Sequence, residues 1–145
     1  IAVDKAMYRG QDNKGRAFNV LAGNAVQVSA DNPVVNMNTL EAQMQMTDGP
    51  AQIRAPRGAY NYHSERLAID GPVNFTAADG YSMVTRNVDI DLKGQKAVGT
   101  GGISGAVPTG TFQANSIQAD LEERTVTLDG NARLRMTPGK LRVPQ

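Results

Sequence analysis

The chain repeats its own pattern of apolar and turn residues, and this recurrence limits the folds that it can adopt. Residues 53–75 return in outline at 112–134 without a gap, an offset of 59 (112 − 53 = 59). Half of that offset aligns a middle copy at 85–103, and a shortened copy covers 22–37. The two longest copies match Ala55 with Ala114, Leu67 with Val126, and Ile69 with Leu128. A repeat of about 20–50 residues cannot bury its own apolar face, so successive copies must stack on one another.

Within the copies, apolar and polar residues alternate with a period of two, which is typical of β-strands. The clearest run places Leu40, Ala42, Met44 and Met46 on one face and polar side chains on the other. A helix would scatter these four residues around its circumference. Polar turns separate the alternating runs at 63–66, 93–96 and 122–124. The repeating unit is therefore predicted to be strand, turn, strand.

The Asp-Gly pairs stand in two settings that predict two kinds of backbone change. Asp48-Gly49 and Asp79-Gly80 lie between alternating runs, where Asp-Gly supplies the positive φ angles of a hairpin turn. Asp70-Gly71-Pro72 and Asp129-Gly130-Asn131 interrupt runs that resume at once, which favours a bend or bulge within one long strand. Repeated bent strands predict two packed antiparallel sheets with inner faces about 10 Å apart.

Length and the position of the first alternating run set the expected domain. Residues 1–16 are polar and end in a turn, so the first strand is predicted at Phe18 to Val20. We predict an all-β fold in which residues 1–145 form a single domain. Its architecture is expected to be an open antiparallel β-jelly roll, or twisted sandwich, of ~30-residue strand-turn-strand repeats.

Composition excludes several classes of function. With 15 basic and 14 acidic residues the net charge is +1, so the positive field that nucleic-acid binding needs is missing. The absence of Cys excludes a disulfide framework and a thiolate metal site. There is no Trp and only 5% of residues are aromatic, so large stacking platforms for sugars or bases are not expected. A binding surface on this chain should be mostly aliphatic.

The polar residues form no strong catalytic or metal-binding motif. His63 lies in a polar turn without the partners of a triad. The Asp-Gly turns lack the ligand spacing of an EF-hand, and Gly99–Gly102 lacks the lysine of a phosphate-binding loop. We therefore predict no enzyme activity, no metal site and no cofactor.

One enzymatic alternative remains, because carboxylates two residues apart resemble the pair that a glycosidase uses. Asp89 and Asp91 form one such pair, and Asp120 and Glu122 form another. Alternation of Asp89 and Asp91 with apolar neighbours favours a solvated strand face instead. The alternative is a repetitive β enzyme that acts on a glycan.

The aliphatic faces are predicted to point between the two sheets, where they could form an ordinary core or a groove for alkyl chains. The candidate groove residues are Met44, Met46, Ile53, Tyr60, Leu67, Ile69, Phe75, Val88, Ile90, Phe112, Ile117 and Leu128. Because burial of alkyl surface is non-directional, the same residues could serve both purposes.

The last strong strand is expected to be an edge of the stack. It comprises Asn131, Ala132, Arg133, Leu134, Arg135 and Met136, with the two arginines on its wet face, and Pro138-Gly139 ends it. An edge strand must be blunted, covered or paired with another chain.

Taken together, these motifs resemble the sequences of the LptC family. The resemblance is carried by Gly10 to Ala22, Arg54 to Tyr60, Ile69 to Val73 and Leu128 to Leu134, in this order along nearly the whole chain. It implies a periplasmic β-jelly roll of the OstA type from Gram-negative bacteria. Such a protein receives lipopolysaccharide from an inner-membrane ABC transporter and passes it to a periplasmic bridge protein of the LptA type.

The resemblance also implies roles for the surfaces named above. Lipid tails would lie among the candidate groove residues, the edge near Phe18 and Val20 would face the transporter, and Asn131 to Met136 would face the bridge protein. Edge pairing would also allow a weak homo-oligomer. The family normally carries one N-terminal membrane helix, and no run here approaches the ~20 apolar residues of such a helix. We therefore expect this chain to be the periplasmic portion of an anchored protein. The alternatives are a soluble bridge protein of the LptA type and a self-polymerising β scaffold.

Overall fold

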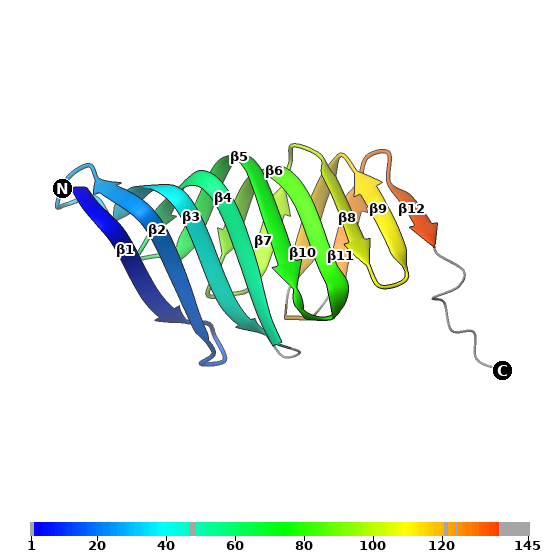
Figure 1. Ribbon diagram of the computed structural model, residues 1–145, viewed down its shortest axis with the longest axis horizontal. Coiled ribbons are helices and arrows are strands. Elements are labelled where there is room, and N and C mark those ends of the chain that lie inside the picture. The colour runs from blue at the N-terminus through cyan, green and yellow to red at the C-terminus, as the bar shows by residue number, and fades with distance from the viewer. Residues whose placement is uncertain (1, 47–48, 121, 124, 137–145) are drawn as a thin grey trace.

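In the described part of the chain, twelve strands form one continuous antiparallel sheet that folds over on itself (Figure 1). The computed structural model describes residues 2–46, 49–120, 122–123 and 125–136. A single 3₁₀ turn, η1 (Ala78–Gly80), is the one helical element in that part of the chain. The strands are β1 (Ala2–Gln11), β2 (Ala17–Gln27), β3 (Val34–Met46), β4 (Gly49–Asn61), β5 (Arg66–Ala77), β6 (Tyr81–Asp91), β7 (Lys96–Gly99), β8 (Ile103–Val107), β9 (Gly110–Ala114), β10 (Ser116–Asp120), β11 (Thr125–Asp129) and β12 (Arg133–Met136).

The sheet divides into two layers at β6. Residues 82–85 of β6 pair with β8, whereas residues 88–91 pair with β7. The sheet then continues through β9 and β12 on one side, and through β10 and β11 on the other. Figure 1 shows β8, β9 and β12 in front and β7, β10 and β11 behind them. We call these the front and back layers. The strands β1 to β6 are bent, so that one half of each strand, which we call a limb, lies in the front layer and the other half lies in the back layer. The predicted open all-β jelly roll is confirmed.

A row of corner residues bends the strands from one layer to the other. Lys5, Thr39 and Asn87 have φ angles of +57°, +53° and +55°, and Gly71 has φ +120°. At such a corner the inward-facing positions step by three residues instead of two, as from buried Met37 to buried Leu40. A one-residue slip in a strand would otherwise turn its apolar side outward. The extra residue therefore keeps both limbs facing the same interior.

Within the described residues, Asp70-Gly71-Pro72 bends one continuous strand as predicted, whereas Asp129-Gly130-Asn131 separates two strands. β5 runs through Asp70-Gly71-Pro72 with a register shift between Ile69 and Pro72, and the chain crosses from β11 to β12 at Asp129-Gly130-Asn131. The chain reverses at η1, which contains Asp79-Gly80. Asp48 lies outside the described residues, but β3 and β4 pair Met46 with Gly49 across that reversal.

The prediction that the first strand begins at Phe18 is wrong, because β1 precedes it. β1 is exposed along most of its length and half-buries only Ala6, Tyr8 and Gly10. Phe18 and Val20 therefore do not lie at an edge. They are 2% and 0% exposed in β2, which is paired with β1 on one side and β3 on the other. The N-terminal edge of the sheet is β1.

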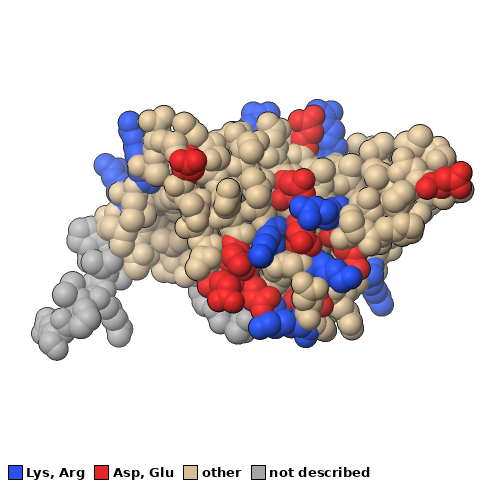
Figure 2. Space-filling view, turned by 180° about the vertical axis from the view of Figure 1, so that it is seen from behind, with Lys and Arg blue, Asp and Glu red and all other residues tan. Residues whose placement is uncertain are grey.

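The core fills the N-terminal half of the space between the layers. Phe18, Leu40 and Tyr60 are each 2% exposed, and Leu67 is fully buried. The Tyr8 ring packs against Tyr60 with 5.4 Å between ring centroids. Figure 2 shows that charged side chains of both signs mix on the back of the molecule. The N-terminal half of the interior is therefore apolar and tightly packed, whereas the outer face of the back layer carries charged side chains.

Candidate functional site

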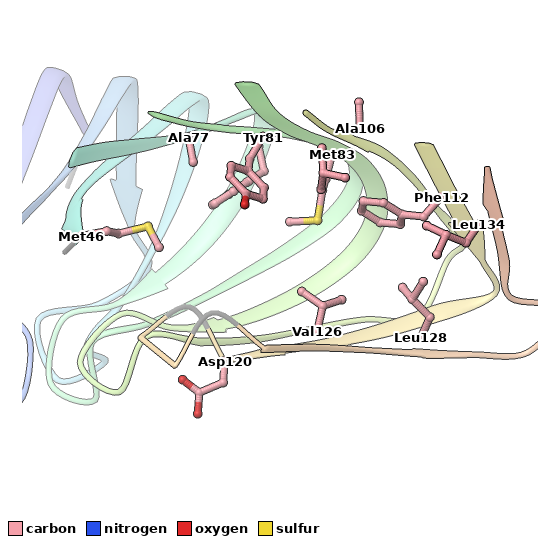
Figure 3. A pocket seen from close by; sticks show the side chains of 12 residues that line it. Met46, Ala77, Tyr81, Met83, Ala106, Phe112, Asp120, Val126, Leu128 and Leu134 are labelled. Carbon is pink, nitrogen blue, oxygen red and sulfur yellow. The ribbon is translucent and has the colours of Figure 1, made fainter. Parts of the chain in front are cut away.

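An apolar groove with a volume of about 250 Å³ lies between the layers in the C-terminal half (Figure 3). Most of its lining comes from the front layer, and the rest comes from β10 and β11 of the back layer. The lining residues are Met46, Phe75, Ala77, Tyr81, Met83, Ala106, Val107, Phe112, Asp120, Val126, Leu128 and Leu134.

Cross-strand register brings the large lining side chains together. Phe75 of β5 stands opposite Met83 of β6, and Phe112 of β9 stands opposite Leu134 of β12. Gly105 of β8 is paired with Phe112 on its other side. A Cβ atom at Gly105 would lie 2.4 Å from Cζ of Phe112, so the ring occupies the space that a side chain would take. This glycine lets the phenyl ring lie flat on the groove wall.

The groove is open because its apolar side chains are only partly covered. Val126 is 48% exposed and Leu134 is 66% exposed, although both face inward between the layers. Met136, at the end of β12, is 41% exposed. Contiguous apolar surface of this kind typically marks a binding site. An alkyl ligand would remove it from water.

The lining carries little polarity. Asp120 borders the groove, but Figure 3 shows its carboxylate pointing away from the interior, and Oδ1 accepts a hydrogen bond from the Glu123 amide at 3.1 Å. Tyr81 provides the other polar group among the lining residues. The groove is therefore suited to aliphatic chains, with selectivity set by shape more than by charge.

The structure separates the predicted groove residues into two groups. Met46, Phe75, Phe112 and Leu128 line the groove. The others face inward but are packed in the buried core, namely Met44, Ile53, Tyr60, Leu67, Ile69, Val88, Ile90 and Ile117. Sequence reasoning omitted Tyr81 and Met83, whose alternation at the start of β6 was the available signal.

The last strand ends the sheet as predicted, although β12 begins at Arg133, after Asn131 and Ala132, and β11 is a second edge that was not predicted. In the described part of the chain β12 pairs only with β9, and β11 pairs only with β10. Arg133 pairs with exposed Gln113, so it lies on the outer face, and Leu134 faces the groove between Arg133 and Arg135. All six residues from Asn131 to Met136 are exposed.

A polar contact joins the two layers beside the inner end of the groove. Gln95, in the β6–β7 turn, donates from Nε2 to Asp12 Oδ2 at 2.7 Å, and the Asn13 amide donates to the Lys93 carbonyl at 2.8 Å. Glu122, which follows β10, forms ion pairs with Lys14 (2.6 Å) and Arg16 (3.4 Å). We call this set, Asp12, Lys14, Arg16, Gln95 and Glu122, the polar latch.

Asp12 is the centre of the polar latch and is 7% exposed. Its Oδ1 accepts hydrogen bonds from the Lys14 and Arg16 amides, and its Oδ2 accepts one from Arg16 Nε at 2.9 Å. Burial raises the pKa of this carboxyl, but these hydrogen bonds outweigh burial and lower the pKa below its ordinary value of 3.8. Asp12 therefore stays ionised at neutral pH.

The carboxylate pairs considered for catalysis have structural partners. Arg66 bridges Asp89 and Asp91 at 3.6 and 3.7 Å on the outer face of the back layer. Asp120 caps the turn at Glu123, and Glu122 belongs to the polar latch. Among the described residues there is no cluster of three or more potential metal-binding side chains. Both pairs therefore take part in contacts that hold strands and turns in place.

Comparisons with known proteins give one family. A family model described as lipopolysaccharide-assembly, LptC-related, matches residues 1–137. No curated protein matches the chain significantly. Within the described residues, no helix has the length and apolar character needed to cross a membrane.

Proposed function

Because the chain belongs to the LptC-related family of lipopolysaccharide-assembly proteins, we propose that it receives lipopolysaccharide from an inner-membrane ABC transporter and passes it to a periplasmic bridge protein. Membership in this family implies a role in lipopolysaccharide transport. The observation that carries the finer proposal is the apolar groove, which lies at the end of the sheet where β11 and β12 each pair on one side only among the described residues.

The proposed mechanism is binding and release without chemistry. Each methylene group of an acyl chain that leaves water for the groove contributes about 0.8 kcal/mol. Since this contribution does not depend on direction, a chain can slide along Met46, Phe75, Met83 and Phe112 without a large change in free energy. The energy for net transport comes from the transporter. No catalytic residue is needed, in agreement with the structural roles of the carboxylate pairs.

The two ends of the sheet are proposed to carry the two partners. A strand of an LptA-type bridge protein that pairs with β12 would continue the groove beyond Leu134. The transporter would meet β1, the N-terminal edge, in place of Phe18 and Val20, which are buried. The same edges would allow weak self-association. We place the domain in the periplasm, held natively at the inner membrane by an N-terminal helix.

Site-specific photo-crosslinking to lipopolysaccharide tests this function. Photoreactive residues at Phe112 and Leu134 point into the groove, and their neighbours Gln113 and Arg133 point outward on the same strands. Adducts at the inward pair alone are expected. Equal labelling of inward and outward positions, or none at either, would contradict lipid carriage in the groove.

A further inference from the structure

The polar latch divides the space between the layers into an open part and a closed part. On its C-terminal side lies the groove, whose first lining residue, Met46, follows Gln45, and the Gln45 carbonyl accepts a hydrogen bond from Gln95 at 3.4 Å. On its N-terminal side Phe18 and Tyr60 are 2% exposed, so no alkyl chain can enter there as the protein stands. The groove ends where the latch begins.

This division conflicts with a relay that starts at the β1 end. A chain that arrives at β1 must pass between the layers where Phe18 is packed before it reaches the groove. The corner row fixes one side of the two layers through covalent strands and their hydrogen bonds. On the opposite side the polar latch connects the turn at 12–16 to two turns of the back layer. Separation of the layers can therefore occur only on the latch side.

The latch has the features of a contact that can open. It depends on a few polar bonds, and one of its cations, the Lys14 side chain, is 65% exposed. Two buried side-chain oxygens near it, Oε1 of Gln95 and Oε2 of Glu65, accept no hydrogen bond from the residues that the structure describes, and each such group costs free energy in the closed state. A Cβ atom at Gly10 would lie 2.6 Å from that Glu65 oxygen, which places it against β1. The closed state is thus not the best arrangement for these polar groups.

We propose that the polar latch is a gate: the turn at 12–16 lifts from Lys93, Gln95 and Glu122 to let an acyl chain pass from the β1 half of the interior into the groove. This inference rests on the proposed function. Closing the gate again behind the chain would restore the packed core and prevent backward movement. Asp12, Gln95 and Glu122 are then positioning residues of the gate and do not touch the lipid in the groove.

A reversible lock tests the gate, and the absence of native Cys makes the lock specific. The pair Asn13→Cys and Lys93→Cys joins two residues whose backbones are hydrogen bonded, so oxidation holds the turn down and reduction frees it. A photoreactive phenylalanine analogue replaces Phe18 in the closed half or Phe112 in the groove. With purified lipopolysaccharide, we expect the oxidised lock to abolish adducts at Phe18 and to leave those at Phe112 unchanged.

A loosened latch gives the opposite change. The variant Gln95→Ala with Glu122→Gln removes the hydrogen bond from Gln95 to Asp12 and the charge that pairs with Lys14 and Arg16. It keeps the backbone bond from Asn13 to Lys93 and the hydrogen bonds that Asp12 accepts within its own turn. We expect labelling at Phe18 and hydrogen exchange of the Asn13 amide to rise roughly tenfold, the scale of one lost charge-assisted hydrogen bond. The matched control changes exposed residues outside the latch, Gln118→Ala with Asp31→Asn, and should change neither.

The outcomes separate the gate from the proposed function. Labelling at Phe112 without labelling at Phe18 in the loosened variant would overturn the gate and leave lipid carriage intact. Labelling at Phe18 that persists in the oxidised lock would also overturn it. If lipopolysaccharide labels neither position, the proposed function fails, and hydrogen exchange decides the gate alone: unchanged exchange at Asn13 in the loosened variant refutes the opening.

Discussion

Replacing Thr39 with glycine should stabilise the protein, because Thr39 is a β-branched residue held at φ +53° in the corner row. A left-handed backbone brings Cβ close to the following carbonyl oxygen at a cost of roughly 1–2 kcal/mol, and glycine avoids that contact. Glycine loses about 0.5–1 kcal/mol through its greater freedom in the unfolded chain. The Thr39 side chain is exposed and faces Gly23 across the strands, so little packing is lost. The net gain in the free energy of unfolding should be about 0.5–1 kcal/mol.

Urea unfolding of Thr39→Gly, with Thr39→Ala as the matched control, measures this gain. Alanine keeps a Cβ atom and should recover little of it, and thermal unfolding should shift upward by about 2–4 °C per kcal/mol in Thr39→Gly. Asn87→Gly provides a second comparison, since Asn87 has the same left-handed backbone but its Oδ1 accepts a hydrogen bond from the Gly71 amide at 3.2 Å. Loss of that bond should cancel the gain. A Thr39→Gly protein less stable than wild type would refute strain at the corner.

Three further predictions concern the groove, the edge and the latch. Leu134→Asp should weaken lipopolysaccharide binding by at least about tenfold, since a carboxylate is costly in an apolar groove. The control Gln113→Asp, which changes an outward-facing residue, should not weaken it. Equal weakening by both substitutions in an equilibrium binding assay would contradict binding in the groove. Gly110→Ala places a Cβ atom 2.0 Å from the Arg135 carbonyl oxygen, so β12 should separate from β9 and lose its protection from hydrogen exchange, whereas Thr111→Ala should keep it; retained protection would refute the close approach. Asp12→Asn should be less stable than wild type above about pH 4, because the lowered pKa of Asp12 makes its contribution complete above the ordinary value of 3.8 and removes it as pH falls through the lowered value. Urea unfolding between about pH 7 and about pH 2 measures that difference, and a difference that grows on acidification would reverse the sign of the argument.

The repeats and the period-two alternation were sufficient to predict the fold, because each copy had to place the same face inward. Leu40, Met44 and Met46 lie inward as the pattern requires. β1 escaped prediction because an edge strand half-buries only one face, and that face carries Ala6, Tyr8 and Gly10 in place of large aliphatic residues. The wrong assignment of Phe18 and Val20 to an edge followed directly from the missing strand.

The sequence predicted that an aliphatic groove could exist, but not which inward-facing residues line it. Met44 and Met46 are one strand period apart and both belong to the buried core, yet only Met46 also lines the groove. Alternation shows which face of a strand points inward, but it does not show which inward positions border an open groove. The polar latch was also beyond prediction, because Asp12 and Gln95 are turn residues 83 positions apart, and turn composition alone explained both.

The bent strands give each end of the sheet two edges in place of one. Among the strands that the structure describes, both limbs of β1 are free on one side at the N-terminal end, and β11 in the back layer and β12 in the front layer are free at the C-terminal end. A partner of the same architecture would therefore pair with two edge strands at once, one in each layer. Once one edge strand has paired, the second is held close to its partner strand. The second set of strand-to-strand hydrogen bonds then forms at a high effective concentration and increases the affinity. A shift in the register of one strand pair would misalign the other pair. Only the register that satisfies both pairs would leave a continuous groove across the interface.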